Sequence, residues 1–325
     1  MGRMGRIQSI RSALPTGWIS AATPLALLVA LVLVIGSIAP GFLKGDTLLL
    51  LLANTAVLFI LAAGVTGVIL IGGIDLSIQA IASLSSVVLA QLLPSLGVMA
   101  FPVALLSGVV FGLVSGIVHV RLKVPSFVAT LATGGVVAGI ALWAADGRSI
   151  TIEADGRAYT AWINGDFAGL PTVVWIAAVI GFLLYLAMRY TPFGRYSLAI
   201  GAGEPAAIAA GINVDRNKII AFVVSGAMAA IAGIILAARL SSGSPTLANQ
   251  LLLPAIAAVI VGGTAITGGL GGVGRTAIGA LIISIVRMGM TFVGINIFAE
   301  NVVFGAMLIL AVAITIDRSK IAVIK

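Results

Sequence analysis

The feature that most constrains this chain is a succession of long apolar runs, separated by short segments rich in Gly, Pro and charged residues. A helix needs about 20 apolar residues to cross the hydrocarbon core of a bilayer. Only 9% of the residues are charged, against about a quarter in soluble domains. We therefore predict an all-α fold, a polytopic membrane helix bundle with about ten transmembrane helices. The candidate spans are 22–39, 47–71, 75–93, 97–118, 125–145, 171–188, 217–239, 247–266, 274–294 and 299–316.

The Lys and Arg residues between these runs predict the orientation of the chain. Ten spans place both termini on one side, and cytoplasmic loops carry an excess of Lys and Arg. With both termini cytoplasmic, 13 basic residues lie in inner segments and four in outer ones, while Arg287 lies within a span. This predicts a cytoplasmic tail at 1–21, a transmembrane domain at 22–316 and a second cytoplasmic tail at 317–325. We interpret the first apolar run as a retained span and not a cleaved signal peptide.

Two hydrophilic segments interrupt the spans, an outer loop at 146–170 and an inner loop at 189–216. Neither is long enough to be an enzymatic domain. A Walker A phosphate loop requires a Gly-Lys dipeptide, and the chain has none. It has no cysteine and a single histidine, His119, which rules out disulfides and a multi-histidine metal site. We expect no catalytic residue, no metal site and no cofactor bound by this chain. The basic residues fit orientation in membrane lipid, so no nucleic acid is expected.

Polar residues within apolar runs are the main clue to function in a membrane protein. The stretch ILIGGIDLSIQAIASL (69–84) stops at two glycines and then presents Asp75. Asp75 is expected to cap the next helix by accepting N–H bonds at its first turn, or to line the route of a polar solute, and the two roles are compatible. Gln79 would then lie one turn further along the same face. Asn54 and Gln79 are candidates for hydrogen bonds between helices or for solute contact.

Glycines spaced four residues apart predict close helix packing, because a helix without side chains at these positions can approach its neighbour closely. Gly108, Gly112 and Gly116 have this spacing in the fourth predicted span, and Gly135 and Gly139 have it in the fifth. We expect both sets to lie at contacts between helices.

Two segments of the chain show a weak internal similarity. AAGVTGVILIGGIDLSIQAIASL (62–84) and AAVIVGGTAITGGLGGVGRTAIGAL (257–281) both consist of an apolar run, a glycine-rich break and a new helix start. Paired interrupted segments in two halves of a chain are a feature of transporters. Arg287, which lies within a span, is expected to pair with Glu300 or to face a watery cavity.

Five motifs, in order, resemble the permease subunits of bacterial ABC sugar importers of the ribose, xylose, arabinose and galactose type. The resemblance runs from about residue 20 to residue 318. The motifs are GGIDLS (72–77), VPSFVATLAT (124–133), TPFGRYSLAIGAGEPAAIAAGINV (191–214), AIAAVIVGGTAITGG (255–269) and GRTAIGALI (274–282).

The resemblance implies a multi-pass permease of the bacterial inner membrane that translocates a monosaccharide or related polyol. A periplasmic sugar-binding protein would deliver the solute, and cytoplasmic ABC ATPase subunits would use ATP to drive the cycle. A second permease subunit, expected to be another copy of this chain, would complete the path. The alternatives are an ion-coupled secondary transporter of a small polar solute and a non-transporting membrane scaffold. Ion coupling is disfavoured because no acidic group is well centred in a predicted span.

The resemblance also implies two sets of functional residues. Irregular backbone at membrane depth is tolerated only against protein or water, so the break near Asp75 is expected to adjoin the path or its inner gate. In the inner loop, Pro near the start and Gly after the end predict a short helix, which would dock on the ATPase. We assign the substrate pathway to Asn54, Asp75, Ser77, Gln79 and Phe127, and the docking loop to Gly203, Glu204, Ala207, Ala210 and Gly211.

Overall fold

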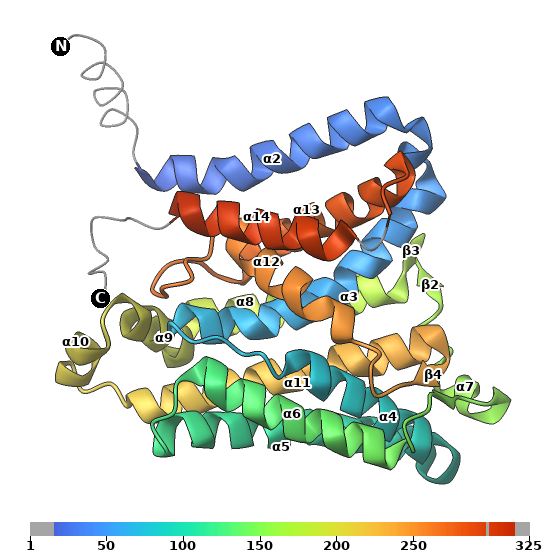
Figure 1. Cartoon of the computed structure of the whole chain (residues 1–325), viewed down its shortest axis with the longest axis horizontal. Helices are drawn as coiled ribbons and strands as arrows, with labels where there is room; N and C mark the ends of the chain where they lie inside the picture. Colours follow the sequence, from blue (N-terminus) through green and yellow to red (C-terminus); the bar gives the residue numbers. More distant parts are fainter. Residues whose placement is uncertain (1–15, 297–298, 316–325) are drawn as a thin grey trace.

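The computed structural model describes residues 16–296 and 299–315, which form a bundle of α-helices (Figure 1). This confirms the mostly helical fold. The predicted tail 317–325 and residues 1–15 of the predicted tail 1–21 lie outside the described residues. The long helices are α2 (Thr16–Ile38), α3 (Gly45–Leu70), α4 (Ile78–Leu96), α5 (Ala100–Arg121), α6 (Ser126–Ala144), α8 (Thr172–Tyr190), α11 (Val214–Leu240), α13 (Val273–Val293) and α14 (Glu300–Thr315).

Shorter elements fill the connections. Two antiparallel pairs of very short strands occur, with Ile150 opposite Gly243 and Asp166 opposite Pro171. The short elements are η1 (Pro40–Leu43), η2 (Gly97–Met99), β1 (Ile150–Thr151), α7 (Ala154–Thr160), β2 (Asp166–Phe167), β3 (Leu170–Pro171), α9 (Pro192–Ala202), α10 (Glu204–Ala209), β4 (Ser242–Gly243), η3 (Asn249–Leu251) and α12 (Leu252–Val261).

Each predicted span overlaps one α-helix, but these α-helices differ in length. Among the described residues, six helical segments are long and apolar enough to cross a membrane, and three further apolar helices are shorter. The predicted span 247–266 is wrong in extent, because α12 has only 10 residues and rises about 15 Å. The helix α2 begins at Thr16, before the predicted start of the first span at 22, and its apolar part is Thr23–Ile38.

One of the six segments, Ile78–Arg121, consists of two antiparallel helices. The hydroxyl oxygens of Ser85 in α4 and Ser107 in α5 are 3.0 Å apart. A continuous helix would separate these residues by about 33 Å, at 1.5 Å per residue. The chain therefore reverses at η2, where Gly97 has φ +53°, a conformation that favours glycine.

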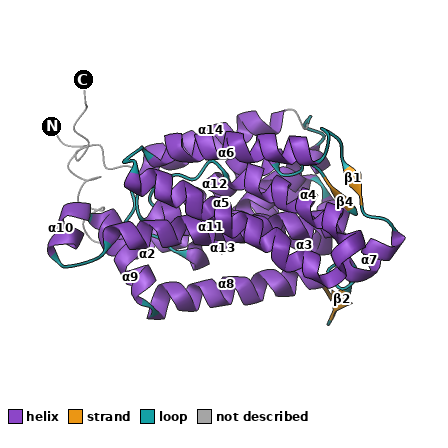
Figure 2. Cartoon of the chain, turned by 90° about the horizontal axis from the view of Figure 1, so that it is seen from below, coloured by secondary structure: helices purple, strands orange, loops and turns teal. Residues whose placement is uncertain are grey.

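The connections between helices gather at two opposite ends of the bundle, one holding α9 and α10 and the other holding α7 and the strands (Figure 2). We call these the α10 end and the α7 end. At the α7 end, β1 pairs with β4, η2 packs on α7, and the rings of Phe42 and Phe292 meet with centroids 5.9 Å apart. At the α10 end, the Gly269 amide donates to the Leu70 carbonyl at 2.9 Å. Successive connections between the long helices and α12 thus alternate between the ends.

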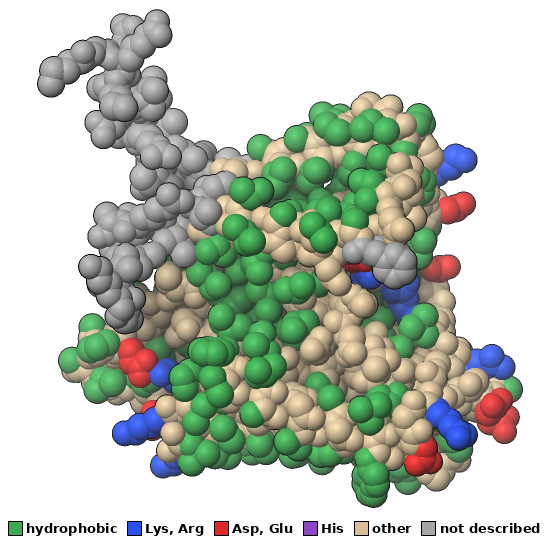
Figure 3. Space-filling view, viewed as in Figure 1, with side chains coloured by type: hydrophobic (Ala, Val, Ile, Leu, Met, Phe, Trp, Pro, Cys, Tyr) green, Lys and Arg blue, Asp and Glu red, His purple; other side chains and the backbone are tan. Residues whose placement is uncertain are grey.

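Most charged side chains in Figure 3 lie at the left and right edges, which hold the two ends, while hydrophobic side chains cover the surface between them. Large apolar side chains of the long helices are widely exposed, including Leu33 (67%), Leu131 (63%) and Phe182 (60%). Soluble proteins rarely expose apolar surface on this scale. The chain has the surface of a multi-pass membrane protein.

The helices α3 and α11 lie at the centre of the bundle, packed against each other and against most of the rest. The prediction for Gly108, Gly112 and Gly116 is confirmed, because all three face α11. A Cβ at Gly112, for example, would lie 2.4 Å from the Phe222 carbonyl oxygen. The prediction for Gly135 and Gly139 is wrong within this chain, because a Cβ at either position would meet no atom within 4 Å.

Candidate functional site

The break after α3 is built by a helix-ending motif that requires glycine. The amide of Gly72 donates to the Ile69 carbonyl, and the amide of Gly73 donates to the Val68 carbonyl, both at 2.9 Å. This is the Schellman pattern, whose first residue beyond the cap takes a left-handed conformation. Gly72 does so, with φ +78°. The two glycines therefore end α3 and turn the chain, as the sequence predicts.

Asp75 follows this turn and is fully buried. Its Oδ1 accepts hydrogen bonds from the Ser77 amide at 2.9 Å and from the Ser77 hydroxyl at 2.6 Å, and its Oδ2 accepts one from the Ser225 hydroxyl of α11 at 2.7 Å. Both carboxylate oxygens are thus occupied by donors of the same chain. In this conformation Asp75 fastens the break to α11.

The predicted capping geometry of Asp75 needs correction. The helix α4 begins at Ile78, and the residue before it, Ser77, occupies the cap position without a capping side-chain bond. Asp75 instead bonds the Ser77 amide, two residues ahead, which is the local turn that Asp side chains favour. Because Asp75 precedes the helix, Gln79 does not continue its face.

The extended backbone between the turn and α4 is satisfied by hydroxyl groups of α6. The Ile74 amide donates to the Ser126 hydroxyl and the Leu76 amide to the Thr130 hydroxyl, each at 3.0 Å. Irregular backbone at membrane depth requires such partners. Sequence reasoning did not select Ser126, Thr130 or Ser225, although the first two lie in the quoted motif at 124–133.

The second glycine-rich segment repeats this architecture. After α12, the Gly263 amide donates to the Ile260 carbonyl at 2.9 Å and the Thr264 amide to the Val259 carbonyl at 3.1 Å. Gly263 has φ +97°, so α12 ends in the same motif as α3. The predicted similarity of 62–84 and 257–281 is therefore present in the backbone, as the same helix-ending motif after α3 and α12.

The two breaks are in contact with each other. Besides the bond from Gly269 to Leu70, the hydroxyl oxygens of Thr66 in α3 and Thr276 in α13 are 2.7 Å apart. A Cβ built on Gly268 would lie 2.7 Å from the Gly72 nitrogen. The segments 71–77 and 262–272 form one joint, which we call the break junction.

Helix α9 of the inner loop packs directly on the break junction. A Cβ on Gly201 would lie 2.0 Å from the Leu70 carbonyl oxygen and 2.2 Å from the Gly269 nitrogen. Real side chains essentially never make contacts this short, so the backbones meet only because residue 201 is glycine. Sequence reasoning missed Gly201, although it lies in the quoted motif at 191–214.

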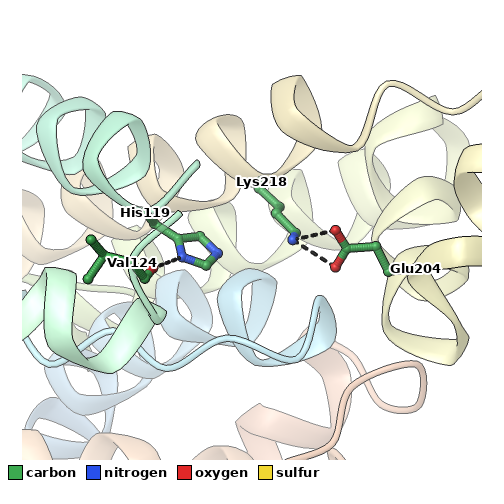
Figure 4. Close-up of polar contacts among 4 residues, drawn as sticks. All are labelled: His119, Val124, Glu204 and Lys218. Carbon is green, nitrogen blue, oxygen red and sulfur yellow. Dashed lines mark hydrogen bonds and ion pairs between the residues drawn. The ribbon is translucent and has the colours of Figure 1, made fainter. Parts of the chain in front are cut away.

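Helix α10 follows at once and confirms the predicted short helix. It starts after Gly203, with Pro205 in its first turn, and it ends in a Schellman motif at Gly211, which has φ +79°. Glu204 Oε1 and Oε2 accept hydrogen bonds from Lys218 Nζ of α11 at 2.9 and 2.8 Å (Figure 4). This ion pair ties α10 to the first turns of α11.

The predicted docking residues do not all face outward. Ala207 is 3% exposed and packs with Val68 and Phe222 in the interior of the chain. Glu204, Ala210 and Gly211 are exposed, and so is Ile208, at 58%. The burial of Ala207 contradicts its place on a docking surface, because its side chain holds α10 on the body of the chain.

The predicted pathway residues do not form one cluster. Asp75 and Ser77 are bonded to each other and buried. Phe127 is 51% exposed in the first turn of α6, and Gln79 is half-buried in α4. Asn54 is exposed on α3, about 24 Å along the helix from its end at Leu70. Among these five residues, only Asp75 and Ser77 are hydrogen-bonded to each other.

Two further polar side chains, those of Arg287 and His119, each have a polar partner within the chain. Arg287 Nε lies 2.7 Å from Glu300 Oε1, so the predicted ion pair is confirmed. His119 Nδ1 lies 2.7 Å from the Val124 carbonyl oxygen at the end of α5 (Figure 4), and its ring meets that of Phe222 edge-on. Arg287 thus links α13 to α14, and His119 links the end of α5 to the loop before α6 and to α11.

Comparison with known proteins gives the family. A family model described as the permease component of the branched-chain amino acid transport system matches residues 47–312. The chain is 37% identical to a ribose import permease of Haemophilus influenzae over 88% of this chain and 90% of that protein. It is 38% identical to the ribose import permease of Bacillus subtilis over 90% and 91%.

An L-arabinose transport permease of Escherichia coli is 40% identical over 64% of this chain and 62% of that protein. The family model and the relatives cover both breaks of the junction and the inner loop between them. The chain therefore belongs to this permease family, together with the ribose and arabinose permeases of bacterial ABC importers, as its motifs indicated.

Proposed function

We propose that this chain is the membrane-spanning permease subunit of an ABC importer that translocates a monosaccharide or related polyol across a bacterial inner membrane. The ribose and arabinose permeases among its relatives support this solute class. A periplasmic binding protein would supply the solute, and separate cytoplasmic ATPase subunits would supply the energy. The chain itself would bind no nucleotide and catalyse no reaction.

The observation that carries the proposal is the contact of α9 with the break junction. A partner that displaced α9 and α10 would move backbone packed on Leu70 and Gly269 at once, because Gly201 leaves no side chain to absorb the motion. Packed interfaces respond by discrete shifts and not by continuous deformation. The inner loop is thus suited to transmit motion from a motor outside the membrane to both breaks.

We also propose ten membrane crossings with both termini in the cytoplasm. The alternation of connections between the α10 end and the α7 end supports this count, with α12 crossing only together with its flanking segments. The described Lys and Arg residues support the orientation, because seven lie at the α10 end and four at the α7 end, with Arg287 inside α13, and cytoplasmic segments carry the excess. The seven are Arg121, Lys123, Arg189, Arg195, Arg216, Lys218 and Arg275, and the four are Lys44, Arg148, Arg157 and Arg239.

The path itself would form between two permease subunits, with a second copy of this chain as the partner. Exposed Asn54 and half-buried Gln79 support this arrangement, since polar groups at the surface of a membrane-spanning helix need a wet or protein environment. Asp75 would act indirectly on the path, because its hydrogen bonds to Ser77 and Ser225 hold in place the break that adjoins it. Ion coupling through Asp75 finds no support, because its carboxylate is fully engaged by Ser77 and Ser225.

The test is transport by the complex as it exists in the membrane. The tagged chain is isolated from its native membranes with its bound partners, reconstituted in vesicles with the binding protein, and supplied with radiolabelled D-ribose and a panel of other pentoses and hexoses. Uptake of at least one sugar should require ATP and resist an uncoupler. Uptake by the chain alone, driven by a proton or sodium gradient without ATP, would show that the proposal is wrong.

A further inference from the structure

A cavity at the α10 end is not used by the proposed transport mechanism. It has a volume of about 360 Å³ and lies between the end of α5 and the start of α11. This volume is within the range of small-molecule sites. Its lining residues are Arg121, Asn213, Asp215, Arg216, Ile219 and Ile220.

The polar part of this cavity favours an anion. The guanidinium groups of Arg121 and Arg216 outnumber the single carboxylate of Asp215. Neither arginine forms an ion pair with any residue in the described part of the chain. Guanidinium groups bind phosphate oxygens through two parallel hydrogen bonds. Two arginines without an ion-pair partner among the described residues that line one cavity are therefore suited in charge and chemistry to one phosphodiester group.

The other part of the cavity is apolar and continues onto the surface of the bundle. Ile219 and Ile220 are half-buried in its wall. On α5, Ile117 and Leu113 precede Arg121 at intervals of four residues and are 42% and 39% exposed, so they lie on the same helix face. A bound anion would thus sit directly above an apolar strip that faces the acyl chains.

We infer that this cavity binds the headgroup of an anionic phospholipid, with Arg121 and Arg216 on the phosphodiester and the acyl chains along Ile219, Ile220 and Ile117. Basic pockets between membrane-spanning helices bind anionic headgroups in this way. A soluble phosphate would gain nothing from the apolar strip, which is why the lipid is the better match. The inference goes beyond the proposed function and does not depend on the transported solute.

The experiment measures lipid retention by the purified full-length chain. The chain in neutral detergent is titrated with dioleoyl phosphatidylglycerol or dioleoyl phosphatidylcholine, and bound lipid is counted by native mass spectrometry. Wild type should prefer phosphatidylglycerol. The double variant Arg121→Gln/Arg216→Gln should bind it about tenfold or more weakly. The matched control Arg148→Gln/Arg157→Gln removes two exposed arginines at the α7 end and should bind as wild type does.

A second variant keeps the test decisive if the double variant folds poorly. Asp215→Asn removes the only carboxylate of the cavity and should strengthen phosphatidylglycerol binding while helix content stays unchanged. Three results would overturn the inference. The first is equal retention of phosphatidylglycerol by wild type, the double variant and Asp215→Asn. The second is displacement of the lipid by an equal concentration of sn-glycerol 3-phosphate. The third, measured on the complex isolated from native membranes, is loss of ATPase subunits from the double variant while it retains lipid as wild type does.

Discussion

At the scale of single residues, Asp75 shows how a carboxylate is tolerated deep in an apolar chain. Its two oxygens accept three hydrogen bonds, two from Ser77 beside it and one from Ser225, 150 residues away. A buried polar group is costly unless such bonds are made. The carboxylate thus holds the irregular segment after α3 on α11, and its first role in this conformation is structural.

We therefore expect Asp75→Ala to destabilise the chain strongly. The amide and hydroxyl of Ser77 and the hydroxyl of Ser225 would lose their shared acceptor, at about 1–3 kcal/mol for each donor left unpaired. The measurement is the free energy of unfolding in detergent, followed by circular dichroism. The control Asp155→Ala, on the exposed surface of α7, should stay within about 0.5 kcal/mol of wild type. Equal free energies of unfolding for Asp75→Ala and Asp155→Ala would contradict the structural role of Asp75.

A second residue-scale prediction concerns the ion pair between Glu204 and Lys218. Glu204→Lys should insert normally and change stability by less than about 1 kcal/mol, but it should uncouple ATP hydrolysis from uptake because two ammonium groups would push α10 from α11. The exchange variant Glu204→Lys/Lys218→Glu restores the pair with reversed charges. If the pair positions α10, the exchange variant recovers coupling, measured as sugar taken up per ATP hydrolysed. An exchange variant as uncoupled as Glu204→Lys would mean that Glu204 acts by touching the ATPase.

At the scale of elements, the break junction and α9 approach each other most closely through backbone at Gly201. Gly201 is the critical position, because any Cβ there would collide with both breaks. Gly201→Ala should force α9 away from Leu70 and Gly269, with a cost in stability of about 1–3 kcal/mol. In the assembled transporter this variant should keep ATPase activity and lose most uptake.

The matched control for this element is Gly274→Ala. Gly274 also lies at the α10 end, in the first turn of α13, but a Cβ there would meet no atom within 4 Å. Its uptake and stability should match those of wild type. Loss of uptake in both variants, or in neither, would contradict the role given to the contact of α9 with the junction.

At the scale of the whole molecule, the two ends predict which residues are reached from each side of the membrane. The chain has no cysteine, so any labelling of a single-cysteine variant by a thiol reagent comes from the introduced residue. In intact cells with a permeable outer membrane, Asp155→Cys and Ile295→Cys at the α7 end should react with a membrane-impermeant maleimide. Ile208→Cys and Leu270→Cys at the α10 end should react only after the inner membrane is opened. Labelling of Leu270→Cys from outside would refute ten crossings, because it would place the loop after α12 on the wrong side.

The sequence alone determined the features that depend on local chemistry. Apolar runs near 20 residues specify membrane helices, the glycines at 72 and 211 specify where α3 and α10 end, and the ordered motifs specify the family. These signals lie within a few residues of the structure that they produce, so one sequence is enough to find them.

Only the tertiary structure decided which distant groups meet. It brought Ser225 to Asp75, placed Gly201 on both breaks, turned Ala207 inward and left Gly135 and Gly139 on the surface. Gly112 and Gly139 have the same local spacing, yet one faces α11 and the other faces outward. The physical reason is that helix rotation and pairing follow from the packing of the whole bundle, which a local pattern of residues does not encode.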